Sequence, residues 1–277
     1  MSQRNILGVM RWLAFVGIGS LSVFAFGQAS VSGPDQFPQF RGYGGLPGNG
    51  MPILPNGLKG RGGATSISTP VGYSMQTWNF HFGGSVMSTN SGIPPFNGRS
   101  GGGEFFNGNG TIWMAGALKF DWWGTFTVTN VIVSGSGDNT TNYHLQFPKE
   151  GNTLAFAVGV QDITGEIGSA GDTFPVEDQR TSRSFYFVTT EQFWGGKGYV
   201  SAGWGSRRFQ KGFANASYWV KDDVVVFAEH DGFNFNGGVG YSLGRFGKGF
   251  GNHDMVGHMS LGLIRGRHPF WTVGIGL

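Results

Sequence analysis

Cysteine is absent from this chain, and charged residues make up only 13% of its 277 positions. Without cysteine there is no disulfide framework, no thiolate metal site and no lipidated N-terminal cysteine. Aromatic residues reach 15%, whereas a disordered chain is poor in aromatics and rich in charge. The formal net charge of +3 comes without a basic cluster on one predicted face, so nucleic acid is not an expected partner.

The chain also lacks an apolar run long enough to span a bilayer as a helix. Its longest such run, residues 12–26, follows Arg4 and Arg11 and ends before the small residues Gly27 and Ala29. A helix needs about 20 residues to span the hydrocarbon core, so residues 1–29 are predicted to be a cleaved signal peptide. A retained N-terminal anchor is the alternative.

Glycine is abundant instead, with 52 residues. Residues 30–63 are rich in glycine and proline and show no hydrophobic period. Such a segment buries too little apolar surface to offset its ordering entropy. We expect a flexible leader here, with a plug inside a barrel as the alternative.

The most informative segment is residues 154–165, LAFAVGVQDITG, in which bulky apolar residues alternate with small or polar ones. In an extended strand this pattern gives one face of bulky apolar side chains and one face of small or polar side chains, as in a transmembrane barrel. Similar short segments recur to the C-terminus at residues 77–87, 111–120, 123–133, 143–147, 153–161, 183–190, 199–204, 214–220, 224–229, 233–241, 255–264 and 271–277.

Residues 64–277 are therefore predicted to form an all-β fold, a transmembrane antiparallel β-barrel of about 12 strands. A soluble β-sandwich is the alternative, but its outer faces must be solvated and these strands carry few charges. The short link 221–223 is expected on the periplasmic side. The longer polar links 88–110, 162–182 and 244–254 are expected to be outer loops.

Four stretches in the same order resemble the YjbH-like family of outer-membrane proteins associated with exopolysaccharide export. Residues 158–165 (VGVQDITG) resemble its Val-Gly-x-Gln-Asp strand end, and residues 63–70 (GATSISTP) resemble an early segment that ends in Thr-Pro. Residues 198–205 (GYVSAGWG) and 226–232 (VFAEHDG) resemble two later strands. Ser66 and His230 depart from the usual glycine and tyrosine. The resemblance implies a polysaccharide-related outer-membrane barrel.

The densest ionisable cluster is Glu229, His230 and Asp231. If Phe227 and Glu229 face the lumen, Asp231 does too, while His230 points outward near a strand end. These groups could act in general acid–base catalysis or bind a cation. We favour the interpretation that they form a hydrogen-bonded cluster at the rim of the barrel. The candidate lumen or rim polar cluster comprises Gln161, Asp162, Glu229, Asp231, Asn234 and Asn236.

Other chemistry is weakly indicated. His258 and Ser260 share one strand face, as in the His-x-Ser pair of barrel lipid A deacylases, but the sequence shows no orienting acid. Residues 244–251 (GRFGKGFG) lack the phosphate-loop spacing, and the histidines lack metal-ligand spacing. A basic rim is conceivable from Arg207, Arg208, Lys211, Arg245 and Lys248. We predict no catalytic, cofactor or metal site.

The expected role is an accessory to exopolysaccharide export or assembly in the bacterial outer membrane. The alternatives are a passive porin-like channel and a lipid A-modifying hydrolase. The expected partners are outer-membrane lipid, lipopolysaccharide, a polysaccharide and the barrel-assembly machinery.

Overall fold

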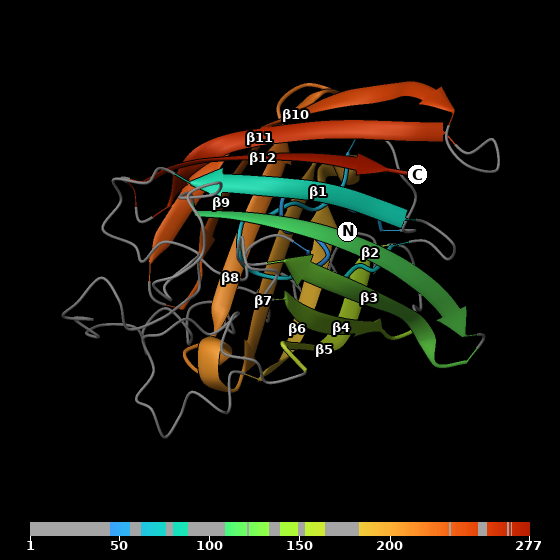
Figure 1. Ribbon diagram of the computed structural model, residues 1–277, viewed down its shortest axis with the longest axis vertical. Coiled ribbons are helices and arrows are strands. Elements are labelled where there is room, and N and C mark those ends of the chain that lie inside the picture. Colours follow the sequence, from blue (N-terminus) through green and yellow to red (C-terminus); the bar gives the residue numbers. More distant parts are fainter. Residues whose placement is uncertain are drawn as a thin grey trace, which may run out of the picture.

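The computed structural model describes residues 45–55, 62–75, 80–87, 109–120, 122–132, 139–148, 153–163, 183–232, 234–248, 254–264, 266 and 268–277. The predicted signal peptide lies outside these residues. Twelve antiparallel strands form one closed barrel (Figure 1). The strands are β1 (Phe80–Met87), β2 (Asn109–Phe120), β3 (Gly124–Ile132), β4 (Asn139–Gln146), β5 (Leu154–Gln161), β6 (Ser184–Phe193), β7 (Gly198–Gly205), β8 (Phe213–Trp219), β9 (Val224–His230), β10 (Phe235–Lys248), β11 (Asp254–Ile264) and β12 (His268–Gly276).

The first and last strands close the barrel. They pair from His81 opposite Gly276 to Met87 opposite Phe270, while every other strand pairs with its neighbours in sequence. Closure leaves no edge strand whose backbone groups would lack partners in lipid. The predicted fold class is confirmed, and each expected strand segment overlaps one observed strand.

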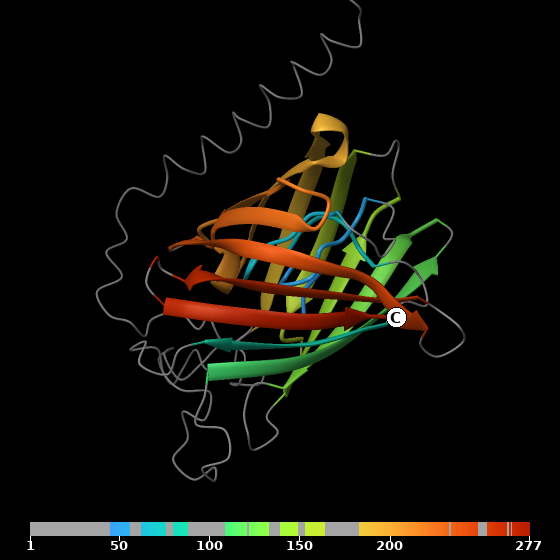
Figure 2. The same ribbon diagram turned by 90° about the horizontal axis from the view of Figure 1, so that it is seen from above.

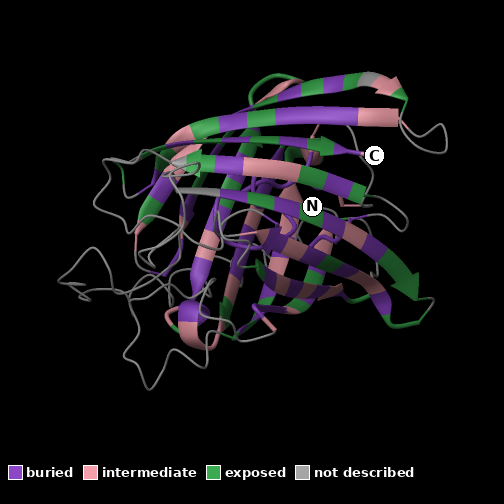
Figure 3. Ribbon diagram, in the orientation of Figure 1, coloured by how far each residue is buried: buried purple, intermediate pink, exposed green. Residues whose placement is uncertain are grey.

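The alternating pattern places apolar side chains on the outside of the wall. On β5, Phe156 is 53% exposed, whereas Ala155 and Ala157 are buried. The same alternation of exposed and buried residues runs along most strands (Figure 3). Large exposed apolar side chains around the wall form the lipid-facing belt of a transmembrane barrel. Among the described residues, no helix is long and apolar enough to cross a membrane.

The barrel interior holds a segment that precedes the first strand. Residues 45–55 and 62–75 pass between the barrel walls (Figures 1 and 2) and are buried along most of their length. We call these two stretches the plug segment. The expected barrel boundary at residue 64 falls within it, because the wall begins only at Phe80. Two bridges, Asn49 with Ser66 and Ile53 with Ala64, join its two stretches.

One expected loop is wrong. Residues 244–248 belong to β10, which continues past its pairing with β9 by pairing with β11 across two register shifts. The glycines do not end the strand because an antiparallel partner continues beside them. The link between β10 and β11 and the link 221–223 both follow an even-numbered strand, so the two lie at the same end of the barrel. The prediction that they lie on opposite sides of the membrane is therefore wrong.

Candidate functional site in the barrel lumen

Glu229 is the centre of the contact between the plug segment and the wall. Its carboxylate accepts hydrogen bonds from the backbone N–H groups of Ile67, Ser68 and Thr69 at 3.0–3.2 Å. The hydroxyls of Ser68 and Thr69 also donate to it, at 2.6 and 2.8 Å. Three successive N–H groups that converge on one carboxylate form an anion-binding nest. The negative charge strengthens each of these hydrogen bonds.

Arg208 joins the same plug residues to a second strand. Its guanidinium donates to the Gln161 side-chain oxygen and to the Ser68 carbonyl oxygen, each at 2.7 Å. Burial lowers the pKa of Arg208 to about 10, while the charges of Asp231 and Glu229 raise it. The side chain is therefore a buried cation at neutral pH. Ser68, Thr69, Gln161, Arg208 and Glu229 together are called the latch below.

The remaining residues of the predicted polar cluster lie beside the latch or support the wall. The Asn236 side-chain amide donates to Glu229 at 2.9 Å and to Asp231 at 3.0 Å, and Asp231 accepts the Asn234 N–H at 2.8 Å. Asp162 instead accepts from the Thr140 hydroxyl at 2.9 Å. The structure thus brings Glu229, Asp231, Asn234 and Asn236 together, links Gln161 to them through Arg208, and ties Asp162 to β4.

Polar contacts hold the plug segment at other points of the wall. The Trp219 indole N–H donates to the Gly63 carbonyl oxygen at 2.8 Å, and the Gly72 N–H donates to the Thr190 hydroxyl at 2.7 Å. The Ser74 N–H donates to the Gln146 side chain at 2.7 Å. Because these partners lie on β8, β6 and β4, the segment is attached to several sides of the barrel.

Apolar packing completes the filling of the lumen. Ile53, Ile67 and Val71 of the plug segment form one buried cluster with inward-facing side chains such as Trp219 and Phe227. Leu46 joins a second cluster on β5, β6 and β8. A segment with its own apolar core against the wall closes the lumen at this level.

The latch lies at the barrel end opposite Phe80 and Leu277. Gln161 ends β5, Arg208 lies in the link after β7, and Glu229 is near the end of β9. The two longest links between strands, 88–108 and 162–183, belong to this same end. Bacterial barrels have short periplasmic turns and longer outer loops, so we expect the latch at the outer end of the lumen.

His258 and Ser260 both face the interior and are buried. The His258 ring stacks on His81 at 5.3 Å between centroids and lies beside the Gly50 backbone of the plug segment. Its neighbours among the described residues are a second ring and the plug backbone, whereas a catalytic triad orients its histidine with a carboxylate. His258 thus packs against the plug segment.

The five basic residues that could have made one basic rim are divided between the two ends of the barrel. Arg245 and Lys248 pair with Asp254 at 2.9 and 2.7 Å, at the end that holds the chain terminus Leu277. Arg207 and Lys211 lie at the opposite end, and Arg208 turns inward. Within the described part of the chain, no three potential ligands are grouped as a metal site.

Sequence reasoning missed the partners that complete the latch. Arg208 is, from the sequence, only one of five basic residues that could form a rim, because nothing in its sequence neighbourhood signals burial. Ser68 and Thr69 lie in the 63–70 stretch, for which the sequence predicts no contact. The available signal was the co-occurrence of that stretch with residues 158–165 and 226–232, which the structure joins through the latch.

No protein-family model matches the chain, and neither does any curated protein. Among solved structures the chain is similar to the KdgM porin, with a TM-score of 0.43 and 8% identity over 72% of this chain and 97% of that one. The same porin in complex with disordered oligogalacturonate gives 0.42 with the same identity and coverage. An outer membrane channel from Pseudomonas putida F1 gives 0.37 and 12% identity over 74% of this chain and 97% of that one.

Proposed function

We propose that this chain is a bacterial outer-membrane barrel that assists export or assembly of an extracellular polysaccharide. The observation that carries the proposal is the latch. Three of the four family-like stretches supply four of its five residues: Ser68 and Thr69, Gln161, and Glu229. If the chain shares the export role of the family it resembles, a polysaccharide has to pass through the barrel. Its passage would then depend on the latch residues, because they hold the plug segment in the lumen.

The lumen chemistry suits a hydrated glycan. Inward-facing positions carry mostly neutral hydroxyl and amide groups, including Thr129, Asn142, Thr190, Ser201, Asn215 and Ser217, all of them buried. Thr190, Asn215 and Ser217 hydrogen-bond the plug segment. Hydroxyls donate and accept hydrogen bonds, and amides offer both functions, so the groups that now bind the plug backbone can bind sugar hydroxyls instead. In this account a glycan passes only after the plug segment moves.

A reversible cross-link tests this requirement. The Ser74 and Thr127 hydroxyl oxygens are 2.5 Å apart, so the two side chains point at one another and cysteines in their places would bring their sulfur atoms together. Because the chain has no cysteine, Ser74→Cys with Thr127→Cys introduces a single pair between the plug segment and β3. We expect oxidation to lower secreted glycan at least severalfold, and reduction to restore it.

The matched control is Ser85→Cys with Thr272→Cys. These hydroxyls are 2.8 Å apart but join β1 to β12 within the wall, so this cross-link leaves the plug segment free. Secreted glycan is expected to stay at the level of the unmodified chain. Full secretion with the plug cross-linked, or unchanged glycan on deletion of the whole gene, would refute the proposal.

A further inference from the structure

Two hydroxyls of the plug segment bind Glu229 in the way that two neighbouring hydroxyls of a sugar ring could. The Ser68 hydroxyl donates to Oε1 of the carboxylate at 2.6 Å, and the Thr69 hydroxyl donates to Oε2 at 2.8 Å. Each carboxylate oxygen thus accepts one hydroxyl from a pair of adjacent carriers. The negative charge strengthens both bonds, and a vicinal diol of a sugar presents the same pair of donors.

Two asparagine amides beside Glu229 extend this pattern. The Asn215 amide donates to the Thr69 hydroxyl oxygen at 2.9 Å, so this hydroxyl accepts from Asn215 while it donates to Glu229. The Asn236 amide donates to Glu229 Oε1 at 2.9 Å. Because a hydroxyl is both a donor and an acceptor, a carboxylate next to an amide uses both functions of each hydroxyl that it binds.

The three wall residues stand in one row across the sheet. Asn215 on β8 is the register partner of Glu229 on β9, and Asn236 on β10 is the register partner of Glu229 on the other side. All three side chains are buried. Register partners on neighbouring strands have their Cβ atoms close together on the same face. Strand pairing therefore sets the spacing of the row, and the plug segment is not needed to position it.

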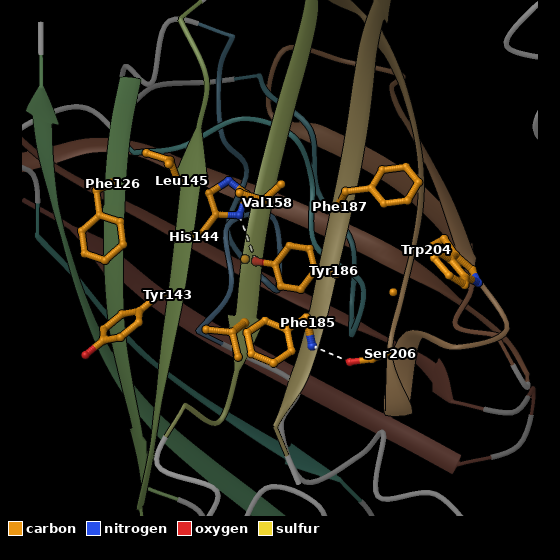
Figure 4. Close-up of a pocket in the computed structure, with 13 residues that line it drawn as sticks. Phe126, Tyr143, His144, Leu145, Val158, Phe185, Tyr186, Phe187, Trp204 and Ser206 are labelled. Carbon is orange, nitrogen blue, oxygen red and sulfur yellow. Dashed lines mark hydrogen bonds between the residues drawn. The ribbon is translucent and has the colours of Figure 1, made fainter. Parts of the chain in front are cut away.

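The outer wall of the barrel offers no comparable set of polar groups at its largest hollow (Figure 4). This hollow has a volume of about 570 Å³ and is lined mostly by apolar side chains, among them the exposed Trp204. His144 and Tyr186 beside it hydrogen-bond each other at 2.9 Å. The Ser206 hydroxyl accepts the Phe185 N–H at 3.0 Å. A hydrated sugar is therefore better matched by the row in the lumen.

We propose that Asn215, Glu229 and Asn236 form a binding site for a sugar with two adjacent free hydroxyls, and that Ser68 and Thr69 fill this site as a substitute while the plug segment is in place. We call the three wall residues the diol site. The proposal rests on the proposed export function and names the chemical group of the glycan that the latch recognises.

A sugar and the plug segment compete for the diol site. Because the site is buried in the closed barrel, a sugar binds only where Ser68 and Thr69 have left it. A ligand that binds one of two states shifts the population toward that state. A polysaccharide carries the same diol in many repeats, which raises its effective concentration at the site. The glycan itself thus favours release of the latch.

Saturation-transfer difference NMR of the purified full-length barrel measures sugar binding. The probes are maltohexaose, whose rings carry adjacent free hydroxyls, and the same hexasaccharide with every hydroxyl methylated. A site that pairs with hydroxyls discriminates strongly against an analogue without them, so we expect maltohexaose to bind at least about tenfold more tightly. Equal binding of the two probes would overturn the proposal.

Variants on the two sides of the latch are expected to have opposite effects. Ser68→Ala with Thr69→Ala removes the substitute hydroxyls and leaves the diol site intact, so the affinity for maltohexaose should rise at least about fivefold. Adding Glu229→Gln removes the carboxylate and should cancel this gain. If Glu229 only held the plug segment, its loss would loosen the plug further and raise sugar binding again. Such a rise, or no change, would overturn the proposal.

The matched control is Ser85→Ala with Thr272→Ala. This pair also removes two buried hydroxyls, which lie 2.8 Å apart on β1 and β12, away from the diol site. Heat-modifiable electrophoretic mobility verifies that each variant is a folded barrel. We expect the control to leave the affinity for maltohexaose unchanged. A gain equal to that of the plug variant would overturn the proposal.

The sugar measurement is independent of glycan secretion. Full secretion in the cross-linking experiment would remove the export role and leave diol-dependent sugar binding intact. Equal binding of the two hexasaccharides alongside the expected cross-linking result would remove only the diol site.

Discussion

At the scale of single residues, Glu229 holds more of the plug segment than any other side chain described. It accepts bonds from three successive backbone N–H groups and from two hydroxyls. Hydrogen bonds to a charged group contribute about 1.5–3 kcal/mol each in protein interiors. The charge, and not only the shape of this side chain, therefore keeps residues 67–69 in place.

Glu229→Gln keeps the size of the side chain and removes its charge, and its amide N–H₂ faces donors that need an acceptor. We expect the free energy of unfolding to fall by about 2–3 kcal/mol and proteases to cleave the plug segment faster. Urea titration in lipid vesicles and limited proteolysis measure the two effects. Asp222→Asn, at an exposed turn position, makes the same chemical change and should alter neither. Equal behaviour of the two variants would contradict the latch.

Arg208→Met removes the cation that lies between Gln161 and the Ser68 carbonyl. Breaking a buried ion network by deleting one member costs about 3–5 kcal/mol, because the remaining charges stay buried. Thermal unfolding should show a much larger loss than Lys221→Met, which removes an exposed cation. If both variants lost stability equally, Arg208 would have no special role.

Neighbouring glycines on β1 make a sharper residue-level contrast. A Cβ at Gly83 would lie 2.2 Å from the Trp113 ring, whereas a Cβ at Gly84 would meet nothing closer than the Thr111 carbonyl at 3.3 Å. We expect Gly83→Ala to lower unfolding free energy by about 1–3 kcal/mol through overpacking. Gly84→Ala should change it by less than about 1 kcal/mol. Equal losses in urea titrations would show that Trp113 is not packed as described.

At the scale of elements, each strand has a lipid face and a lumen face. The loss of stability caused by a charged side chain on the lipid face depends on its position along the strand. Met114 lies midway along β2 and is 52% exposed, while Phe235 begins β10 and is 74% exposed. We expect Met114→Arg to lower stability in vesicles by about 2–4 kcal/mol and Phe235→Arg by about 0–1 kcal/mol. A reversed order would contradict the placement of the bilayer on the wall.

The strands were predictable because a lipid-facing residue and a lumen-facing residue must alternate. The alternation is visible in neighbouring residues: on β5 Phe156 faces lipid and Ala157 faces the lumen, and on β12 Trp271 faces lipid and Thr272 faces the lumen. The length of β10 was not predictable in the same way. Glycines at 244 and 247 are compatible with either a loop or a strand. Only their pairing with β11, Gly244 opposite Gly257 and Gly247 opposite Met255, decides between the two.

At the scale of the whole molecule, the plug segment is the feature that the sequence showed least clearly. Its glycines and prolines carry no period, because its backbone is held by single contacts to many strands rather than by a ladder. Gly63, for example, contacts Trp219, more than 150 positions away in sequence. Position in the lumen follows from such long-range contacts, which no local pattern encodes.

We infer that the plug segment closes the lumen of a transmembrane barrel. Planar-bilayer conductance distinguishes a closed lumen from an open one when the intact chain is compared with a chain lacking residues 45–75, whose folding is verified by heat-modifiable electrophoretic mobility. We expect almost no open steps from the intact chain and stable, larger steps from the shortened one. Equal open conductance from both chains would contradict it.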